Sequence, residues 1–140
     1  MKIVIRVPTR KQILQRSQTV PVARDGTSWN KDCLGEFANM SGVYIHSSGN
    51  TILYVGKTTR GLYATYGERL RRECQKKASA DSRLYRLLLS QRSVKTAFYP
   101  TKEVEKMIQA KNLPRENMTL LLERALIAVY KPGGNRDSQG

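Results

Sequence analysis

Short runs of strand-forming residues alternate with turn-forming residues in the middle of the chain. Residues 42–46 (Gly-Val-Tyr-Ile-His) and 51–56 (Thr-Ile-Leu-Tyr-Val-Gly) flank the tetrapeptide Ser-Ser-Gly-Asn. This pattern predicts a β-hairpin. A third run of β-branched and aromatic residues ends before Pro100. We therefore expect a mainly antiparallel three-stranded sheet, with strands near 42–46, 51–56 and 93–99.

Apolar residues at helical spacing predict the helices that flank this sheet. The clearest helix covers 118–130, where one stripe contains Met118, Leu121, Leu122, Ala125, Leu126 and Val129. Leu120, Ile127 and Tyr130 form a second apolar flank, so we expect this helix to be covered on most sides. Further helices are expected at 66–77, near 82–88 and at 102–111, the last with Val104 and Ile108 directed inward.

The first forty residues show a weaker pattern. Residues 2–7 have the composition of a strand, and the remainder up to Met40 is irregular, with a short helix expected over 31–38. All six charges before Asp25 are positive. We expect one α/β (α+β) domain: a basic N-terminal extension (1–40) packed on or beside a core (41–136), followed by a polar tail (137–140).

Charge indicates the class of partner. The 140 residues include 25 Lys and Arg against 11 Asp and Glu, which gives a net charge of +14. Such a charge favours polyanions, because Lys and Arg side chains that neutralise phosphates release condensed counterions. No stretch approaches the roughly 20 apolar residues that a membrane span requires. Cys33 and Cys74 lie far apart and are interpreted as reduced thiols of a cytoplasmic protein.

Several catalytic motifs are excluded by the sequence. Gly56-Lys57-Thr58 resembles the end of a phosphate-binding loop, but position 51 is threonine where that loop requires glycine. A nuclease site with an acidic-x-Lys triplet is excluded because the chain has no such triplet. The single histidine, His46, excludes hydrolysis by a histidine-held metal, and we expect a structural or surface role for it.

Two tripeptides remain, Gly42-Val43-Tyr44 and Tyr54-Val55-Gly56. They are followed by Glu68-Arg69-Leu70, then by Glu123 in the apolar helix, and finally by Pro132 and Asn135. With these ordered motifs the sequence resembles the GIY-YIG endonuclease family, with valine replacing isoleucine in both tripeptides. The resemblance covers residues 42–135 and implies a small sheet flanked by helices.

The resemblance also implies roles in phosphodiester hydrolysis. Tyr44 would activate water as a phenolate, with Lys57 as the cation that lowers its pKa, and Tyr54 would hold the water or phosphate. Arg69 would clamp the non-bridging oxygens. Glu123 would bind Mg²⁺ or Mn²⁺. Further contacts to double-stranded DNA are expected from Asn135, Arg71, Arg72, Tyr63 and Tyr66.

One position departs from the family pattern. Many relatives have His or Tyr four residues after the helix arginine, where this chain has Glu73. Tyr63 or Tyr66 could replace that hydroxyl, or Glu73 could pair with Arg69. The expected function is a compact restriction-type DNA endonuclease, in which cutting both strands needs a homodimer or two sequential events. The alternatives are a repair or mobile-element nuclease of the same family, or a non-catalytic nucleic-acid-binding module such as an inactive GIY-YIG domain or a ribosome-type protein.

Overall fold

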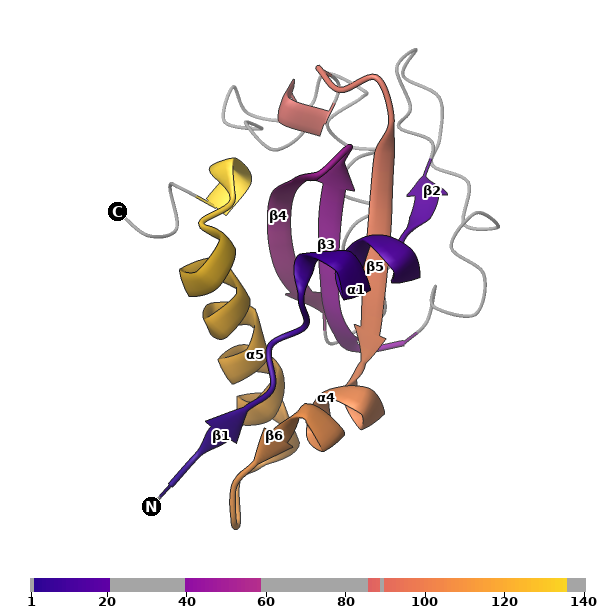
Figure 1. Cartoon of the computed structure of the whole chain (residues 1–140). Coiled ribbons are helices and arrows are strands. Elements are labelled where there is room, and N and C mark those ends of the chain that lie inside the picture. Colours follow the sequence, from indigo (N-terminus) through magenta and orange to yellow (C-terminus); the bar gives the residue numbers. More distant parts are fainter. Residues whose placement is uncertain (1, 21–39, 59–85, 89, 136–140) are drawn as a thin grey trace.

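A computed structural model describes residues 2–20, 40–58, 86–88 and 90–135 of the chain, which form a mixed α+β fold (Figure 1). The helical elements include α1 (Arg10–Arg16), α4 (Thr101–Met107), α5 (Arg115–Tyr130) and the 3-10 turn η3 (Gly133–Asn135), and residues 86–88, within the helix expected near 82–88, are also helical. The strands are β1 (Val4–Ile5), β2 (Gln18–Val20), β3 (Gly42–Ser48), β4 (Thr51–Thr58), β5 (Val94–Pro100) and β6 (Ile108–Gln109).

The main sheet has four antiparallel strands in the order β2-β5-β3-β4. The predicted hairpin is confirmed as β3 and β4, joined by a turn in which Gly49 has φ +59°. The predicted third strand is confirmed as β5, which pairs with β3. The expectation of three strands is wrong, because β2 adds a fourth by pairing with the outer side of β5.

The segment 10–20 was expected to be irregular, but it forms helix α1 and strand β2. Helix α1 begins with a capping box, in which the Thr9 side chain accepts from the backbone of Gln12 and the Gln12 side chain accepts from the backbone of Thr9. Ile13 is fully buried and joins the hydrophobic core. The N-terminal strand is also shorter than expected, since only β1, within the predicted residues 2–7, pairs with β6.

The polar helix expected over 102–111 ends early, at Met107. The next two residues form β6, in which Ile108 pairs with Ile5 of β1. Val104 and Ile108 are both buried, as predicted. The helix ends here because the backbone N–H and carbonyl groups of β6 form hydrogen bonds with β1, in place of those that a further helical turn would provide.

The apolar helix predicted over 118–130 is confirmed as α5, which begins three residues earlier at Arg115. Leu122 and Leu126 are fully buried, whereas Val129 is 58% exposed. Full burial is confined to one stripe of α5, while Leu120, Ile127 and Tyr130 are half-buried, so the second flank is less covered than expected. The helix ends with Lys131 in the left-handed conformation (φ 46°), directly before Pro132.

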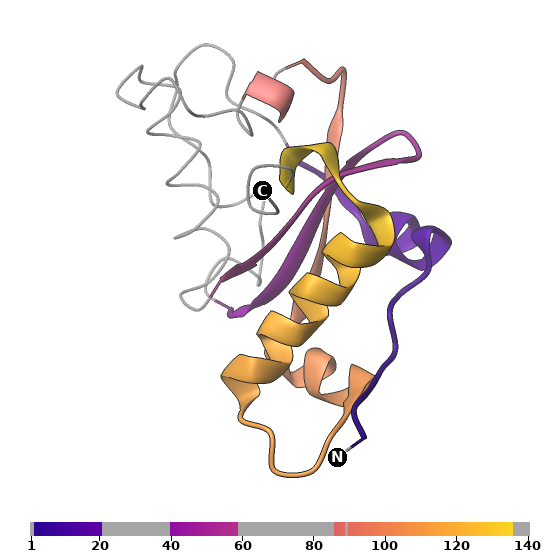
Figure 2. The same ribbon diagram turned by 90° about the vertical axis from the view of Figure 1, so that its left-hand side faces the viewer.

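The core lies between one face of the sheet and helices α1, α4 and α5. The sheet contributes mainly Val43, Ile45, Val55, Ala97 and Tyr99, and the helices contribute Ile13, Val104, Leu122 and Leu126. Figure 2 shows α1 and α5 on the same side of the sheet. In the described residues, no helix combines the length and apolar character that crossing a bilayer requires.

Candidate functional site

The two tyrosine-containing tripeptides lie side by side in the centre of the sheet. Tyr44 of β3 is directly opposite Gly56 of β4, and His46 is directly opposite Tyr54. Because side chains alternate between the two faces of a strand, these four positions share one face. This face is opposite the one that carries the core valines and Ile45.

A glycine is sterically required in each tripeptide. A Cβ atom at Gly56 would lie 2.5 Å from both Cζ and Oη of Tyr44, so the tyrosine ring lies across this position. A Cβ atom at Gly42 would overlap the carbonyl oxygen of Tyr99 in the neighbouring strand. The glycines therefore allow the close approach of Tyr44 to β4 and of β3 to β5.

Tyr44, His46 and Tyr54 form an aromatic cluster on this face. The ring centroids of Tyr44 and Tyr54 are 6.1 Å apart, and the His46 ring lies 5.1 Å from Tyr44 and stacks on Tyr54 at 6.0 Å. Tyr44 is 2% exposed, whereas Tyr54 is only partly buried. A substrate that contacts the Tyr44 hydroxyl therefore requires a conformation in which this group reaches solvent.

His46 is a neutral member of this cluster. The side chain is fully buried, and burial lowers its pKa to about 3. Its Nδ1 is 2.8 Å from the hydroxyl oxygen of Thr96 in β5, which fixes the orientation of the ring. We expected a structural or surface role for this histidine, and its burial excludes the surface alternative. The sequence signal for this arrangement is their spacing: Tyr44 and His46 are two residues apart on one strand, so their side chains share a face.

Lys57 and Glu123 form a second group, which lies on the helix-covered side of β4. Lys57 has the same strand parity as the core residue Val55, and it is opposite Val43 in the register. Glu123 lies on α5, the helix that packs on this face. Burial raises the pKa of Glu123, and the positive charges of Lys57 and Arg124 partly oppose that rise. The Lys57 charge thus acts on the carboxylate of Glu123.

The two groups are connected through strand β4. Tyr54 and Lys57 are three residues apart, about 10 Å along an extended strand, and alternate to opposite faces. The structure therefore brings Tyr44 to Tyr54 and Lys57 to Glu123, and β4 joins the two pairs. Arg69, Arg71, Arg72, Tyr63, Tyr66 and Glu73 lie outside the described residues.

Asn135 contacts the middle of β4. Its Oδ1 accepts a hydrogen bond from the backbone N–H of Val55 at 2.8 Å, and its Nδ2 donates to the carbonyl oxygen of the same residue at 2.9 Å. Gly134 allows this approach, because a Cβ atom there would lie 2.7 Å from the carbonyl oxygen of Leu53. Asn135 is 3% exposed and holds η3 against β4. Its contact with substrate stays a prediction.

The described residues contain no group of three or more His, Cys, Asp or Glu side chains that could enclose a metal ion. A single carboxylate such as that of Glu123 is a suitable protein ligand for Mg²⁺, because this ion commonly retains several water ligands and takes others from substrate phosphates. The raised pKa of this carboxyl reflects loss of solvent, which a bound cation would compensate. Glu123 is therefore a fitting single ligand from this part of the chain.

Comparisons with known proteins give no family assignment. Neither family models, nor curated proteins, nor solved structures give a match to this sequence or fold. The function of this α+β chain is therefore inferred from the arrangement of its described residues.

Proposed function

We propose that this chain is a divalent-metal-dependent DNA endonuclease of the GIY-YIG type, acting as a compact restriction-type enzyme. The observation that carries the proposal is the pairing of the two tripeptides. Tyr44 lies across Gly56 and 6.1 Å from Tyr54, so the residues that define the resemblance also meet in space. The tyrosine of the first tripeptide thus requires the glycine of the second, which would not be expected of sequence motifs that matched by chance.

The residue types suit phosphodiester hydrolysis. This reaction needs a base for the attacking water and positive charge for the oxygens of the transition state. Tyr44 is proposed as the base and Tyr54 as the group that orients the water, because the two phenols are neighbours on one face. Arg69 is proposed to bind the non-bridging oxygens.

Glu123 and Lys57 are proposed to serve the leaving-group side of the reaction. A divalent ion held by Glu123 would supply charge stabilisation at the leaving oxygen. The ammonium of Lys57 is proposed to favour the ionised carboxylate, because its charge partly opposes the rise in pKa that burial causes at Glu123. This role differs from the sequence expectation, which assigned the Lys57 charge to Tyr44.

DNA is the proposed substrate because the chain carries a net charge of +14. Phosphate contacts by Lys and Arg give affinity that falls steeply with salt, whatever the base sequence. Arg71, Arg72, Tyr63, Tyr66 and Asn135 are the proposed further contacts. Cleavage of both strands would need a homodimer or two successive cuts.

A non-catalytic nucleic-acid-binding module is the second candidate, and one observation favours it. Tyr44 is 2% exposed, and the Lys57 and Glu123 pair lies on the opposite side of the sheet from it. A domain that kept the tyrosines for packing alone would have this arrangement.

The two candidates are separated by a plasmid-cleavage assay with Mg²⁺ or Mn²⁺. The wild-type protein is compared with Tyr44→Phe, Tyr54→Phe and Glu123→Gln, and Glu105→Gln on α4 is the matched control for removal of a carboxylate. We expect cleavage by wild type and control, and loss of at least about 100-fold for Tyr44→Phe and Glu123→Gln, in line with removal of a general base or a metal ligand. DNA binding should persist in Glu123→Gln.

The negative outcomes also differ from one another. Cleavage that survives both Tyr44→Phe and Glu123→Gln would refute the proposed site. Salt-sensitive binding without any cleavage, over varied DNA and both metals, would favour the binding module. Sequencing of the cut ends would then test the restriction-type assignment, because recurrent ends identify a recognition site.

A further inference from the structure

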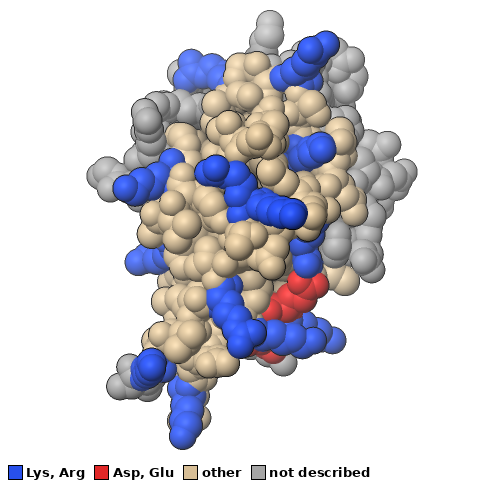
Figure 3. Space-filling model, viewed as in Figure 1, with Lys and Arg blue, Asp and Glu red and all other residues tan. Residues whose placement is uncertain are grey.

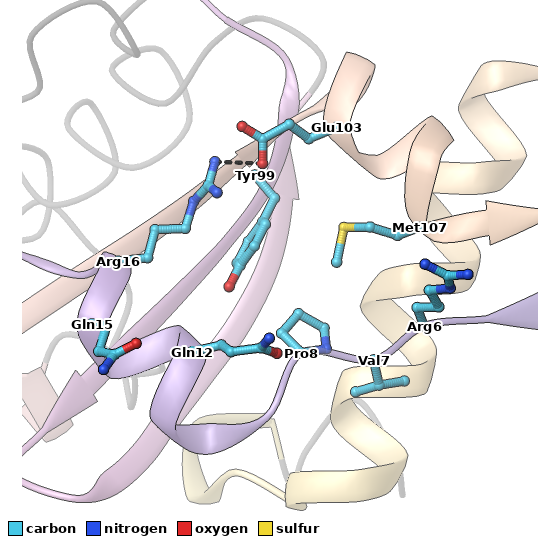
Figure 4. Close-up of a pocket in the computed structure, with 9 residues that line it drawn as sticks. All are labelled: Arg6, Val7, Pro8, Gln12, Gln15, Arg16, Tyr99, Glu103 and Met107. Atoms are coloured by element: carbon cyan, nitrogen blue, oxygen red, sulfur yellow. Dashed lines mark ion pairs between the residues drawn. The ribbon is translucent and has the colours of Figure 1, made fainter.

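A pocket of about 550 Å³ lies between α1, α4 and the end of β5 (Figure 4). Its walls are the segment Arg6–Pro8, Gln12, Gln15 and Arg16 of the first helix, Tyr99, Glu103 and Met107. Tyr99 belongs to the helix-covered face of the sheet, so the pocket is separated by the sheet from the cluster around Tyr44. Its volume lies within the range of small-molecule sites, about 300–1,000 Å³.

One wall of the pocket is rigid and electrically balanced. Nε of Arg16 donates to the carbonyl oxygen of Phe98 at 2.7 Å, and Nη2 pairs with Oε2 of Glu103 at 2.7 Å. The same guanidinium lies 4.3 Å from the centroid of the Tyr99 ring. Glu103 thus offsets the charge of Arg16, and Arg6 remains as the uncompensated charge among the three charged side chains of the lining.

The interior presents hydrogen-bond donors. Burial raises the pKa of Tyr99 to about 12, so its hydroxyl stays protonated and can donate. Oε1 of Gln12 already accepts from the backbone of Thr9, which leaves its NH₂ group to face a ligand. Figure 4 shows the Tyr99 hydroxyl and the end of Gln12 directed into the same space beside Pro8.

The remaining surface is apolar. Val7, Pro8 and Met107 line the side away from Arg16 (Figure 4). A ligand that fits therefore has an apolar body, an edge with hydrogen-bond acceptors toward Gln12 and Tyr99, and one anionic end toward Arg6. An inorganic anion lacks the apolar body, and a fatty acid lacks the polar edge. A nucleotide combines all three features.

We propose that this pocket binds a single nucleotide, with its base beside Met107 and Pro8 and its phosphate at Arg6. The nucleotide is either free or an unpaired unit of a nucleic-acid strand, since both offer the same base and phosphate. The proposal does not depend on nuclease activity.

The surface around the pocket suits either source. Within the described residues 2–20, all charged side chains are positive, namely Lys2, Arg6, Arg10, Lys11 and Arg16. Figure 3 shows Lys and Arg side chains across the middle of this face, where α1 runs, and Asp or Glu side chains at its lower right. This charge attracts phosphates to the pocket entrance.

The test is an NMR titration of the ¹⁵N-labelled full chain in EDTA, which excludes metal-dependent cleavage. The probes are the four common nucleoside monophosphates, adenosine, inorganic phosphate, and one short oligonucleotide as a single strand and as a duplex. We expect saturable shifts at Val7 and Met107 with monophosphates. If the single strand binds at least tenfold more tightly than the monophosphates, and the variants below weaken both in the same way, the ligand is a nucleic-acid strand. Equal affinity of single strand and monophosphates identifies the free nucleotide.

Four variants test the assigned contacts. Arg6→Ala should weaken monophosphate binding about fivefold to tenfold and leave adenosine unchanged. Tyr99→Phe, which keeps the ring, should weaken binding of adenosine and monophosphates about threefold to tenfold. Gln12→Glu retains the capping box but removes the NH₂ donor, and should also weaken both. Lys111→Ala removes an exposed charge outside the pocket and should have no effect.

Three results would overturn the proposal. The first is the absence of saturable shifts with both monophosphates and single strand. The second is that inorganic phosphate binds as tightly as the monophosphates, which would show that the base contributes nothing to binding. The third is equal weakening by Arg6→Ala and Lys111→Ala, which would indicate non-specific charge. Thermal unfolding of each variant confirms that its fold is retained before the titration is interpreted.

Discussion

Replacement of Gly56 by alanine should destabilise the protein, because the Tyr44 ring occupies the space that the new methyl group needs. The added Cβ would lie 2.5 Å from Cζ and Oη of Tyr44. Non-bonded carbon atoms prefer separations of about 3.5–4.0 Å, so the ring or the strand must move by roughly 1 Å. Tyr44 is 2% exposed, so the ring has no direct path into solvent.

The cost of such overpacking is about 1–3 kcal/mol. A domain of this size changes its melting temperature by about 4 °C per kcal/mol, so Gly56→Ala should lower Tm by about 4–12 °C. Gly133→Ala is the matched control, because a Cβ atom there meets nothing within 4 Å. The control should be neutral or slightly stabilising, since alanine restricts the unfolded chain.

Circular dichroism during heating, together with urea unfolding at neutral pH, measures both variants. Equal melting temperatures for Gly56→Ala and Gly133→Ala would refute the close approach of Tyr44 to β4. A double-variant cycle adds a second check. Tyr44→Leu removes the atoms that clash, so Gly56→Ala should cost less in that background than in the wild type.

Three further predictions concern single side chains. Because the pKa of His46 is about 3 in the folded chain and 6.5 for a solvated imidazole, the unfolded chain binds a proton first as the pH falls. The free energy of unfolding measured in urea should fall by about 1.4 kcal/mol for each unit by which the pH falls between those values, and His46→Gln should reduce this dependence on pH. The folded pKa of Glu123 is raised, so its stabilising contribution is present below the unfolded pKa and is lost as the pH rises through the folded one. Glu123→Gln should therefore unfold at higher urea than wild type at pH 7 but not at pH 4, and the opposite order would contradict the burial of this carboxyl. Asn135→Ala removes both hydrogen bonds to Val55 and should cost about 1–3 kcal/mol in urea unfolding, whereas no change would show that water replaces the amide.

Local pattern predicted the central elements of the fold. The hairpin follows from the strand-forming runs on either side of Gly49. Helix α5 follows from the helical spacing of Leu122 and Leu126, which both pack in the core. Helix α1 has few apolar positions and was missed, although the Thr9 and Gln12 capping box was readable. Strand β6 was missed because Ile108 leaves the helix only to pair with Ile5, a partner far away in the sequence.

The site was predicted in part. Two tyrosines on paired strands were expected to be neighbours, and their rings are 6.1 Å apart. The side of the sheet on which Lys57 lies was decided by strand parity, which separates it from Tyr54 and directs it to the face packed by α5. That direction depends on the strand continuing to Thr58, whereas the sequence predicted that the strand ends at Gly56. The partial burial of Glu123 follows from its apolar neighbours along α5.

The amide of Asn135 has a consequence for assembly. Among the strands that the structure describes, β4 is the last on its side of the sheet, and both the outward N–H and the outward carbonyl group of Val55 bond to this one side chain. A foreign strand that approached would find these positions already taken, so the sheet is protected there from growing into a neighbouring molecule. If the proposed nuclease acts as a homodimer, its two copies would have to meet through a different surface.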